Sequence, residues 1–224
     1  MLKKIFRKFK IFHNIYIKHK FFIKKKSYSF DGEDLIVEKY FKEKPPGVYI
    51  DVGCHNPIHL NNTLLLHKKK WKGINIDTSQ FSIDLFNYMR PNDLNYNCAI
   101  SNNNEDVKLY FQKEFSLLST IQIDHAEKFM QGTIKEKTIK AFTLDEIISK
   151  SIYKNSKIDF LDIDIEGADL KALEGLSFDK FEPELICIEI HDKEIKESEI
   201  YKFLVDKKYE LIWSGIFSHI FKRL

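Results

Sequence analysis

Short apolar runs alternate with amphipathic stretches from residue 48 to the end of the chain. The apolar runs have the length of buried strands, and the stretches between them carry apolar residues at helical spacing. Predicted strands cover 48–52, 73–77, 96–100, 158–164 and 184–190, a further edge strand 107–111, and a closing antiparallel pair 209–213 and 219–222. Predicted helices cover 62–70, 82–89, 143–149, 168–176 and 195–207. This alternation is typical of a doubly wound α/β sheet with mostly parallel strands.

The first 26 residues follow a different pattern. Leu2, Ile5, Phe9 and Phe12 recur every three or four positions, and basic residues fall on the other side. The pattern predicts an amphipathic helix. Such a helix suits an anionic membrane surface, and it equally suits docking on the body of the protein or on a partner. We expect residues 1–26 to form a basic arm and residues 27–224 to form the main domain.

A short helix is predicted between the arm and the sheet. Its apolar face begins at Leu35, and Ser29 or Asp31 could cap its start. Pro45-Pro46-Gly47 then forms the sharpest break in the chain, and the sheet is expected to begin just after it.

The charge of the 224-residue chain is unevenly distributed. The net charge is +3, but the first 26 residues hold ten basic and no acidic residues, which leaves a net −7 on the remainder. Only three of the 36 basic residues are arginines, which disfavours nucleic-acid recognition by the acidic body. The three cysteines are widely spaced, which indicates reduced thiols, and no run approaches 18 apolar residues. We expect a cytoplasmic protein, peripheral at the inner face of the membrane if the arm binds lipid.

Candidate site residues follow the predicted strands, because ligands of open α/β sheets bind at the carboxyl ends of the strands. The first strand leads into Gly53 and the second ends at Asp77, where a carboxylate can accept hydrogen bonds from ribose hydroxyls. Neither a GxGxxG nor a GxxxxGK[ST] motif occurs, which argues against a dinucleotide site and a P-loop.

Acidic residues are densest at the last two parallel strands. Asp162, Asp164 and Glu166 alternate along one strand, and Glu189-Ile190-His191-Asp192 closes the next. Crowded carboxylates are costly without a cation or a proton. A general base, a clamp for a cationic substrate and a hard-metal site are all compatible with this pattern, and so is a purely structural role for Glu189 and His191.

The chain resembles the FkbM-type family of S-adenosylmethionine-dependent methyltransferases. The matching stretches are 49–57, Asn62-Thr63, 71–77, 143–146, 158–167 and 183–191. The resemblance implies the Rossmann-like class I methyltransferase fold, with seven strands, helices on both faces and an antiparallel C-terminal hairpin.

The resemblance also implies roles for individual residues. The cofactor S-adenosylmethionine would contact Asp51, Gly53, His55, Asn62, Asp77, Asn97 and Ser101. The expected catalytic residues are Asp164, Glu166 and His191. Nothing in the sequence demands a metal, although Asp164, Glu189 and Asp192 are compatible with Mg²⁺.

The expected activity is O-methylation of a hydroxyl, with a sugar of a surface polysaccharide or glycolipid precursor as the acceptor. The acceptor rests on the family resemblance, with support from the basic arm. The alternatives are a non-catalytic binding module that retains the fold, and a methyltransferase acting on a non-carbohydrate small molecule. Residues 102–142, including Ser119-Thr120, are expected to form walls of the site.

Overall fold

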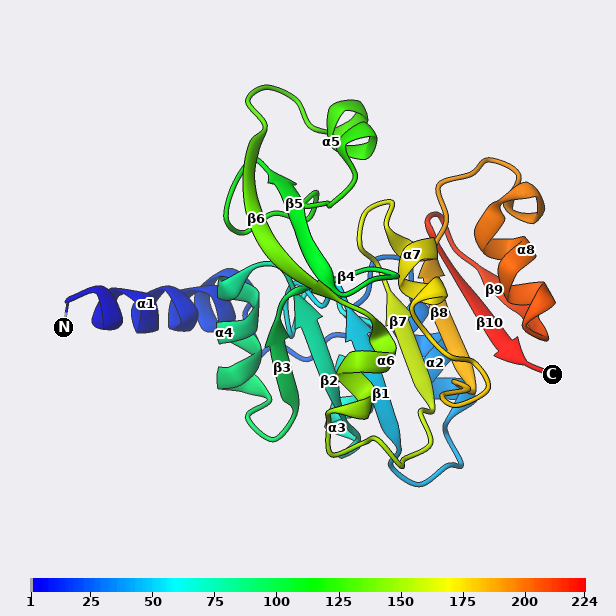
Figure 1. The fold of residues 1–224 in the computed structure, drawn as a ribbon. Coiled ribbons are helices and arrows are strands. Elements are labelled where there is room, and N and C mark those ends of the chain that lie inside the picture. The colour runs from blue at the N-terminus through cyan, green and yellow to red at the C-terminus, as the bar shows by residue number, and fades with distance from the viewer. Residues whose placement is uncertain (1) are drawn as a thin grey trace.

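A seven-stranded sheet forms the centre of the computed structural model, which describes residues 2–224 (Figure 1). In spatial order its strands are β3 (Leu94–Asn97), β2 (Lys72–Asp77), β1 (Val48–Val52), β7 (Phe160–Ile163), β8 (Leu185–Glu189), β10 (Ser218–Arg223) and β9 (Tyr209–Ser214). The first five run parallel, and β10 pairs antiparallel with both β8 and β9. The predicted mostly parallel sheet with an antiparallel C-terminal hairpin is confirmed.

Helices cover both faces of this sheet, as predicted. They are α2 (Glu33–Tyr40), α3 (Leu64–Lys68), α4 (Gln80–Met89), α6 (Leu144–Ser149), α7 (Asp169–Glu174), α8 (Glu199–Asp206) and the short 3₁₀ helix η2 (Ile195–Glu197). Alternate residues of a strand point to opposite faces. Ile50 and Val52 therefore pack in the core formed with α6, α7 and α8, while Tyr49 packs in the core formed with α2 and α3.

A second, three-stranded sheet stands over the carboxyl ends of the parallel strands (Figure 1). It contains β4 (Ala99–Ile100), β6 (Lys135–Phe142) and β5 (Glu105–Phe111), and the loop from β5 to β6 carries α5 (Ile123–Phe129). Two strand predictions are corrected here. The strand predicted over 96–100 is split between the two sheets, and 107–111 pairs with β6 instead of lying on the edge of the main sheet. Strand β6 was missed because polar residues occupy both of its faces, so it shows no alternating pattern.

The start of α2 also differs from the prediction. Its N-cap is Gly32, which has a left-handed backbone (φ 93°) and makes no side-chain cap. The Ser29 hydroxyl instead accepts a hydrogen bond from the Gly32 backbone N–H at 3.1 Å, and Asp34 accepts one from Tyr28 N–H at 2.7 Å. Side-chain hydrogen bonds therefore hold the segment before α2. Glycine occupies the N-cap position because its left-handed backbone conformation is strained for residues with a side chain.

The N-terminal arm forms α1 (Leu2–Phe12) and continues as a π-helix, η1 (His13–Lys18), which is anchored on the body. Ile15 is fully buried against Ile58, Leu64 and Leu85, and the Asn56 amide donates to the Asn14 side-chain oxygen at 2.9 Å. None of the helices in residues 2–224 has the length and hydropathy needed to cross a membrane.

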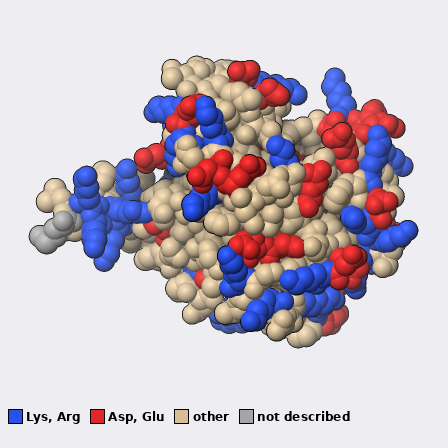
Figure 2. All heavy atoms as spheres, viewed as in Figure 1, with Lys and Arg blue, Asp and Glu red and all other residues tan. Residues whose placement is uncertain are grey.

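Helix α1 projects beyond the body, and its lysines and arginine gather along it (Figures 1 and 2). Its contacts with the body come from the basic side, where Arg7 pairs with Asp84 of α4 and Ile11 packs near Ile15. The apolar side is exposed, with exposed fractions of 50–83% at Leu2, Ile5, Phe6, Phe9 and Phe12. The apolar stripe of the arm is therefore turned away from the protein.

Candidate active site

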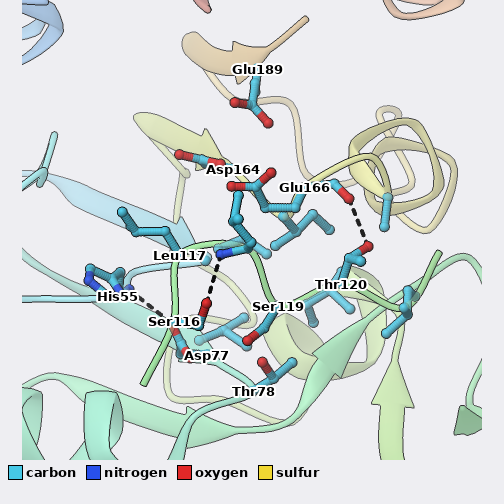
Figure 3. A pocket seen from close by; sticks show the side chains of 18 of the residues that line it. His55, Asp77, Thr78, Ser116, Leu117, Ser119, Thr120, Asp164, Glu166 and Glu189 are labelled. Atoms are coloured by element: carbon cyan, nitrogen blue, oxygen red, sulfur yellow. Dashed lines mark hydrogen bonds between the residues drawn. The ribbon is translucent and has the colours of Figure 1, made fainter. Parts of the chain in front are cut away.

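A cavity of about 380 Å³ lies at the carboxyl ends of β1, β2, β7 and β8. Its floor is formed by the turns that follow these strands, and residues 116–121 from the loop between β5 and β6 form its roof (Figure 3). The segment between the third and fourth parallel strands thus provides a wall of the cavity, as the sequence predicts.

The turn after β1 is possible only because residue 53 is glycine. Gly53 has φ 84°, and a Cβ atom there would lie 1.8 Å from the backbone oxygen of Asp164. No side chain fits that space, so glycine lets the turns after β1 and β7 touch. Because β1 and β7 are neighbours in the sheet, this contact keeps their two ends side by side at the cavity.

Asp77 ends β2 and faces the cavity (Figure 3). Its carboxylate accepts hydrogen bonds from the backbone N–H groups of His55 at 2.9 Å and Ser79 at 2.6 Å. Burial raises the pKa of Asp77 to about 6, although both hydrogen bonds favour the ionised form and oppose the shift. The two backbone donors orient the carboxylate, whose remaining lone pairs are available to a ligand hydroxyl.

The turn after β7 is strained and held from two directions. Glu166 (φ 55°) and Gly167 (φ 88°) both have left-handed backbones, which is uncommon for a residue such as glutamate. The Thr120 hydroxyl, from the roof, donates to the Glu166 backbone oxygen at 2.7 Å. Asp169 accepts from the backbone N–H groups of Ile165 and Gly167, each at 3.0 Å. The strain is therefore maintained by contacts that fix where the Glu166 side chain points.

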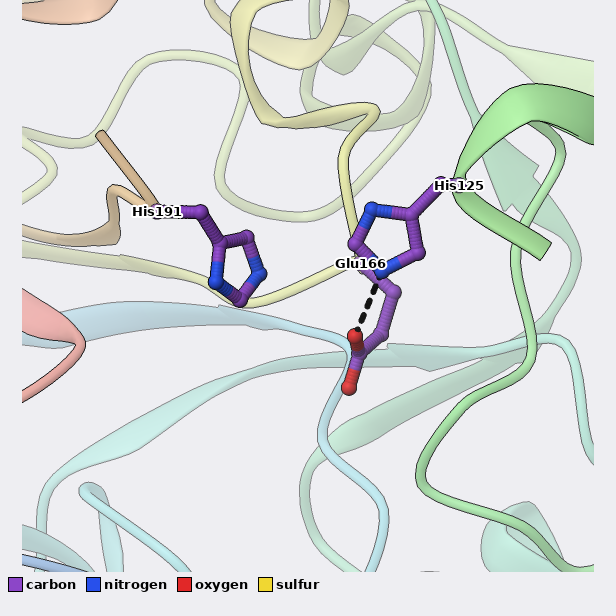
Figure 4. Close-up of side chains that lie close together, drawn as sticks. All are labelled: His125, Glu166 and His191. Carbon is purple, nitrogen blue, oxygen red and sulfur yellow. Dashed lines mark hydrogen bonds and ion pairs between the residues drawn. The ribbon is translucent and has the colours of Figure 1, made fainter. Parts of the chain in front are cut away.

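Three carboxylates and the His191 imidazole line the end of the cavity away from Asp77, and the His125 imidazole lies beside them. Asp164, Glu166 and Glu189 each have an oxygen within 4.8 Å of the others. His125 Nε2 lies 3.0 Å from Glu166 Oε2, and His191 Nε2 lies 3.0 Å from Glu189 Oε2 (Figure 4 shows the two histidines and Glu166).

Enclosure of these groups shifts their protonation. Burial, followed by the nearby Asp169 and Glu166 carboxylates, raises the pKa of Glu189 to about 9. Protein atoms packed around the Asp164 carboxylate, and then Glu189, raise the pKa of Asp164 above its usual range, although the residue as a whole is solvent-exposed. Burial and the neighbouring His191 lower the pKa of His125 to about 4. The neighbouring carboxylates disfavour one another's ionisation, and a bound cation would relieve this repulsion.

The structure brings eight of the predicted site residues around this one cavity. They are Gly53, His55, Asn62, Asp77, Asp164, Glu166, Glu189 and His191. Four other residues named from the sequence do not line it. Asn97 is exposed and donates its amide to the Asp77 backbone oxygen at 2.9 Å, Ser101 is buried, Asp192 is exposed, and Asp51 lies beneath the cavity floor. The roles assigned to all of these residues stay predictions.

Asp51 belongs to a buried polar network centred on Arg90. The Thr63 hydroxyl donates to Asp51 at 2.6 Å and the Asn61 amide at 3.2 Å. The Arg90 guanidinium, 1% exposed, donates to Thr63 Oγ1 at 2.8 Å, Asn61 Oδ1 at 2.7 Å and the Pro57 backbone oxygen at 3.1 Å. Arginine offers five donors in a fixed planar arrangement, so one side chain can fix the whole loop between β1 and α3.

His125 and Asp169 are site residues that the sequence analysis missed. His125 lies in α5, within a segment whose sequence shows no periodic pattern, and only the fold brings it to Glu166. Asp169 had a local signal, because it follows Gly167 by two residues at the start of a predicted helix, where a carboxylate accepts backbone hydrogen bonds.

The sheet order, the C-terminal hairpin and a cavity at the carboxyl ends of the parallel strands define a class I methyltransferase architecture. The family model "Methyltransferase FkbM domain" matches residues 51–211. The chain belongs to this family and is an S-adenosylmethionine-dependent methyltransferase.

Solved structures similar to this chain share only a low sequence identity with it. The chain is similar to magnesium protoporphyrin IX methyltransferase (ChlM) from Synechocystis PCC 6803, at 14% identity over 99% of this chain and 97% of that chain, with a TM-score of 0.45. It is also similar to monomeric WbdD, at 14% identity over 85% of this chain and 40% of that chain, with a TM-score of 0.42. No curated protein matches the chain.

The cavity fits S-adenosylmethionine, which the family implies as the cofactor. Gly53 permits close approach to the backbone, Asp77 is oriented for a ribose, and the carboxylates at the other end suit a positively charged sulfonium. In addition, Glu189 Oε2 is a buried acceptor without a hydrogen-bond partner among the described residues.

We expect binding of S-adenosylhomocysteine to strengthen as the pH rises from 5 to 7.5. Asp77 is mostly protonated below its pKa of about 6, and a neutral carboxyl group accepts hydrogen bonds from ribose hydroxyls more weakly than a carboxylate, so the ionised form binds better. Replacement by asparagine (Asp77→Asn) should weaken binding about tenfold at pH 7.5, since a hydrogen bond to a charged group contributes about 1.5–3 kcal/mol. The same variant should flatten the pH profile.

Calorimetric titration measures both effects. The matched control is Asp106→Asn, on the exposed side of β5, which should bind as the wild type does. An unchanged pH slope in Asp77→Asn would contradict the assignment of Asp77 to the ribose.

Proposed function

We propose that the chain methylates a hydroxyl of a sugar in a surface polysaccharide or glycolipid precursor at the inner face of the membrane. The observation that carries this proposal is the single cavity that joins Asp77 to the cluster of Asp164, Glu166 and His191. One end suits a nucleoside, and the other end offers groups that can accept a proton from a hydroxyl.

The roles of the residues follow from their positions. When bound, S-adenosylmethionine supplies an electrophilic methyl group. Asp77 holds the ribose, which fixes the methyl donor near the turn after β7. Burial raises the pKa of Glu166, which makes its carboxylate a better acceptor for a hydroxyl proton, and Thr120 holds its backbone in place. Asp164 and His191 flank the position of the acceptor.

The cavity rim supports an acceptor with an apolar part. Phe30, Leu117, Phe129 and Phe217 line the cavity and are all exposed. The Phe30 and Phe217 rings lie 5.9 Å apart and come from opposite ends of the chain. Exposed apolar side chains gathered at a cavity mouth are typical of a binding site. A sugar attached to a lipid would place its polar part inside and its apolar part on this rim.

Replacement of Asp164 by asparagine (Asp164→Asn) should lower methyl transfer to lipid-linked glycans about 100-fold or more while the fold is retained. The substitution removes the Asp164 carboxylate, which flanks the acceptor beside Glu166, and loss of a positioned acid or base costs about 100- to 10,000-fold. Transfer of labelled methyl groups from S-adenosylmethionine into glycan fractions measures the rate. Asp106→Asn serves again as the control. Full activity of Asp164→Asn would contradict a role for Asp164 in methyl transfer.

The exposed stripe of α1 supports attachment to an anionic membrane. Five apolar side chains face away from the protein, and Lys3, Lys4, Lys8 and Lys10 flank or oppose them. A helix of this kind lies in the membrane interface with its apolar face inward and its lysines near the lipid phosphates. Because the basic side holds the contacts with α4, the apolar side is free to enter lipid.

We expect the full chain to sediment with phosphatidylglycerol vesicles and much less with phosphatidylcholine vesicles. The double replacement Phe6→Ser and Phe9→Ser should reduce the bound fraction at least about tenfold, because each buried apolar side chain contributes about 1.5–3 kcal/mol. Ile152→Ser removes an equally exposed apolar residue from a loop of the body and should bind as the wild type does. Equal sedimentation of the wild type and the double variant would contradict membrane attachment through α1.

A further inference from the structure

Two histidines and a glutamate converge beside the cavity from three separate elements. His125 comes from α5, Glu166 from the turn after β7, and His191 from the loop after β8 (Figure 4). Each offers one ligand atom, and all three atoms lie within 4.8 Å of one another. Ligand atoms that share an ion at about 2.1 Å are separated by roughly 3.0–3.4 Å. The 3.0 Å between His125 Nε2 and Glu166 Oε2 is already at that spacing.

The fold positions the His125 imidazole closely. A Cβ atom on Gly167 would lie 2.6 Å from His125 Nδ1, so the ring packs directly on the backbone of the turn that carries Glu166. The side chains of His125 and Glu166 are only 10% and 14% exposed. The hydrogen bond from Thr120 to the Glu166 backbone joins the same two segments. These contacts preorganise an imidazole and a carboxylate, as a metal site requires.

A buried, unpaired oxygen points to a cation at this place. Glu189 is 9% exposed, and its Oε2 lies 3.0 Å from His191 Nε2 without forming a hydrogen bond with any described residue. Asp164 and Glu166 place further carboxylate oxygens within 4.8 Å of Glu189. A buried carboxylate oxygen without a donor costs free energy unless a cation compensates it.

We propose that His125, Glu166 and His191 bind a divalent first-row transition-metal ion, such as Zn²⁺ or Co²⁺, with Glu189 beside it. Two imidazole nitrogens favour these ions over Mg²⁺, which prefers an all-oxygen set. The site therefore differs from the set of Asp164, Glu189 and Asp192 considered for Mg²⁺, of which Asp192 lies outside the cavity.

An ion at this place would have a structural and a chemical consequence. It would connect α5, in the roof of the cavity, to the ends of β7 and β8, so that metal binding orders the roof. With Glu166 engaged as a ligand, the Lewis acidity of the ion would take the place of Glu166 as proton acceptor and favour the deprotonated form of a hydroxyl in the cavity. This second consequence rests on the proposed methylation of a hydroxyl.

Metal binding is tested on the full chain after removal of bound ions with a chelator. Calorimetric titration should give one Zn²⁺ or Co²⁺ per chain, and the visible spectrum of Co²⁺ should report nitrogen and oxygen ligands. Millimolar Mg²⁺ should not displace either ion. His125→Gln and His191→Gln should each lower the affinity about 100-fold or more, since loss of outer partners alone accounts for about 10- to 100-fold.

The control is His59→Gln. His59 stacks on His19 at 4.6 Å outside the cavity, so this variant measures binding by surface histidines and should retain the cavity site. Circular dichroism checks folding, and His191→Gln, at a partly exposed loop position, keeps the test decisive if His125→Gln does not fold.

Three results would overturn the proposal: no stoichiometric binding, unchanged binding by both cluster variants, or loss of binding in His59→Gln alone. The first two would leave the cluster as an ion-pair network. Stoichiometric binding lost in the cluster variants, together with an absence of methyl transfer by the wild type, would instead reject the proposed function and retain the metal site.

Discussion

The site depends on the contact between the turns after β1 and β7. Gly53 lies so close to Asp164 that a Cβ atom would stand 1.8 Å from the Asp164 backbone oxygen. Strands β1 and β7 are neighbours, so the end of the cavity at β1 and β2, where we expect the nucleoside, is continuous with the acidic end at β7 and β8. A side chain at residue 53 would separate the two halves of the site.

Electrostatics gives this arrangement its selectivity. The carboxylates of Asp164, Glu166 and Glu189 converge within 4.8 Å of one another. Loss of solvent around the carboxylates and their mutual repulsion raise the pKa of Asp164 and Glu189, and burial raises that of Glu166. A cation stabilises such a site, and the sulfonium of the family's cofactor carries the required charge. The imidazoles of His125 and His191 extend the same argument to a metal ion. The net positive charge of the whole chain conceals the acidity of the main domain, because the basic residues of the arm offset it.

The sequence was sufficient for most of the main sheet because four of its five parallel strands, β1, β2, β7 and β8, are largely buried and apolar and end at a glycine or a carboxylate. Strand β3 is only partly buried, and its bounds were predicted less well. Asp77, Asp164 and Glu166 could be found because strand ends have a fixed relation to the cavity. The second sheet could not be predicted, since β6 carries polar residues on both faces. His125 was missed as well, because it lies in the segment between β5 and β6 and only the folding of that segment brings its ring onto Gly167.

The location of Asp51 shows a different limit. From the sequence, a carboxylate near a glycine turn resembles a ligand contact. The structure places it in the Arg90 network under the floor, where it accepts hydrogen bonds from Thr63 and Asn61. A local motif does not distinguish a residue that touches a ligand from one that fixes the loop around it, because both need a buried carboxylate at a strand end.

A crystal structure of the full chain with S-adenosylhomocysteine tests the central claim most directly. We expect the ribose hydroxyls on the Asp77 carboxylate, the backbone of Gly53 against the ligand, and the sulfur directed toward Asp164. Ligand density outside this cavity, or a reversed ligand with its ribose at Glu189, would contradict it.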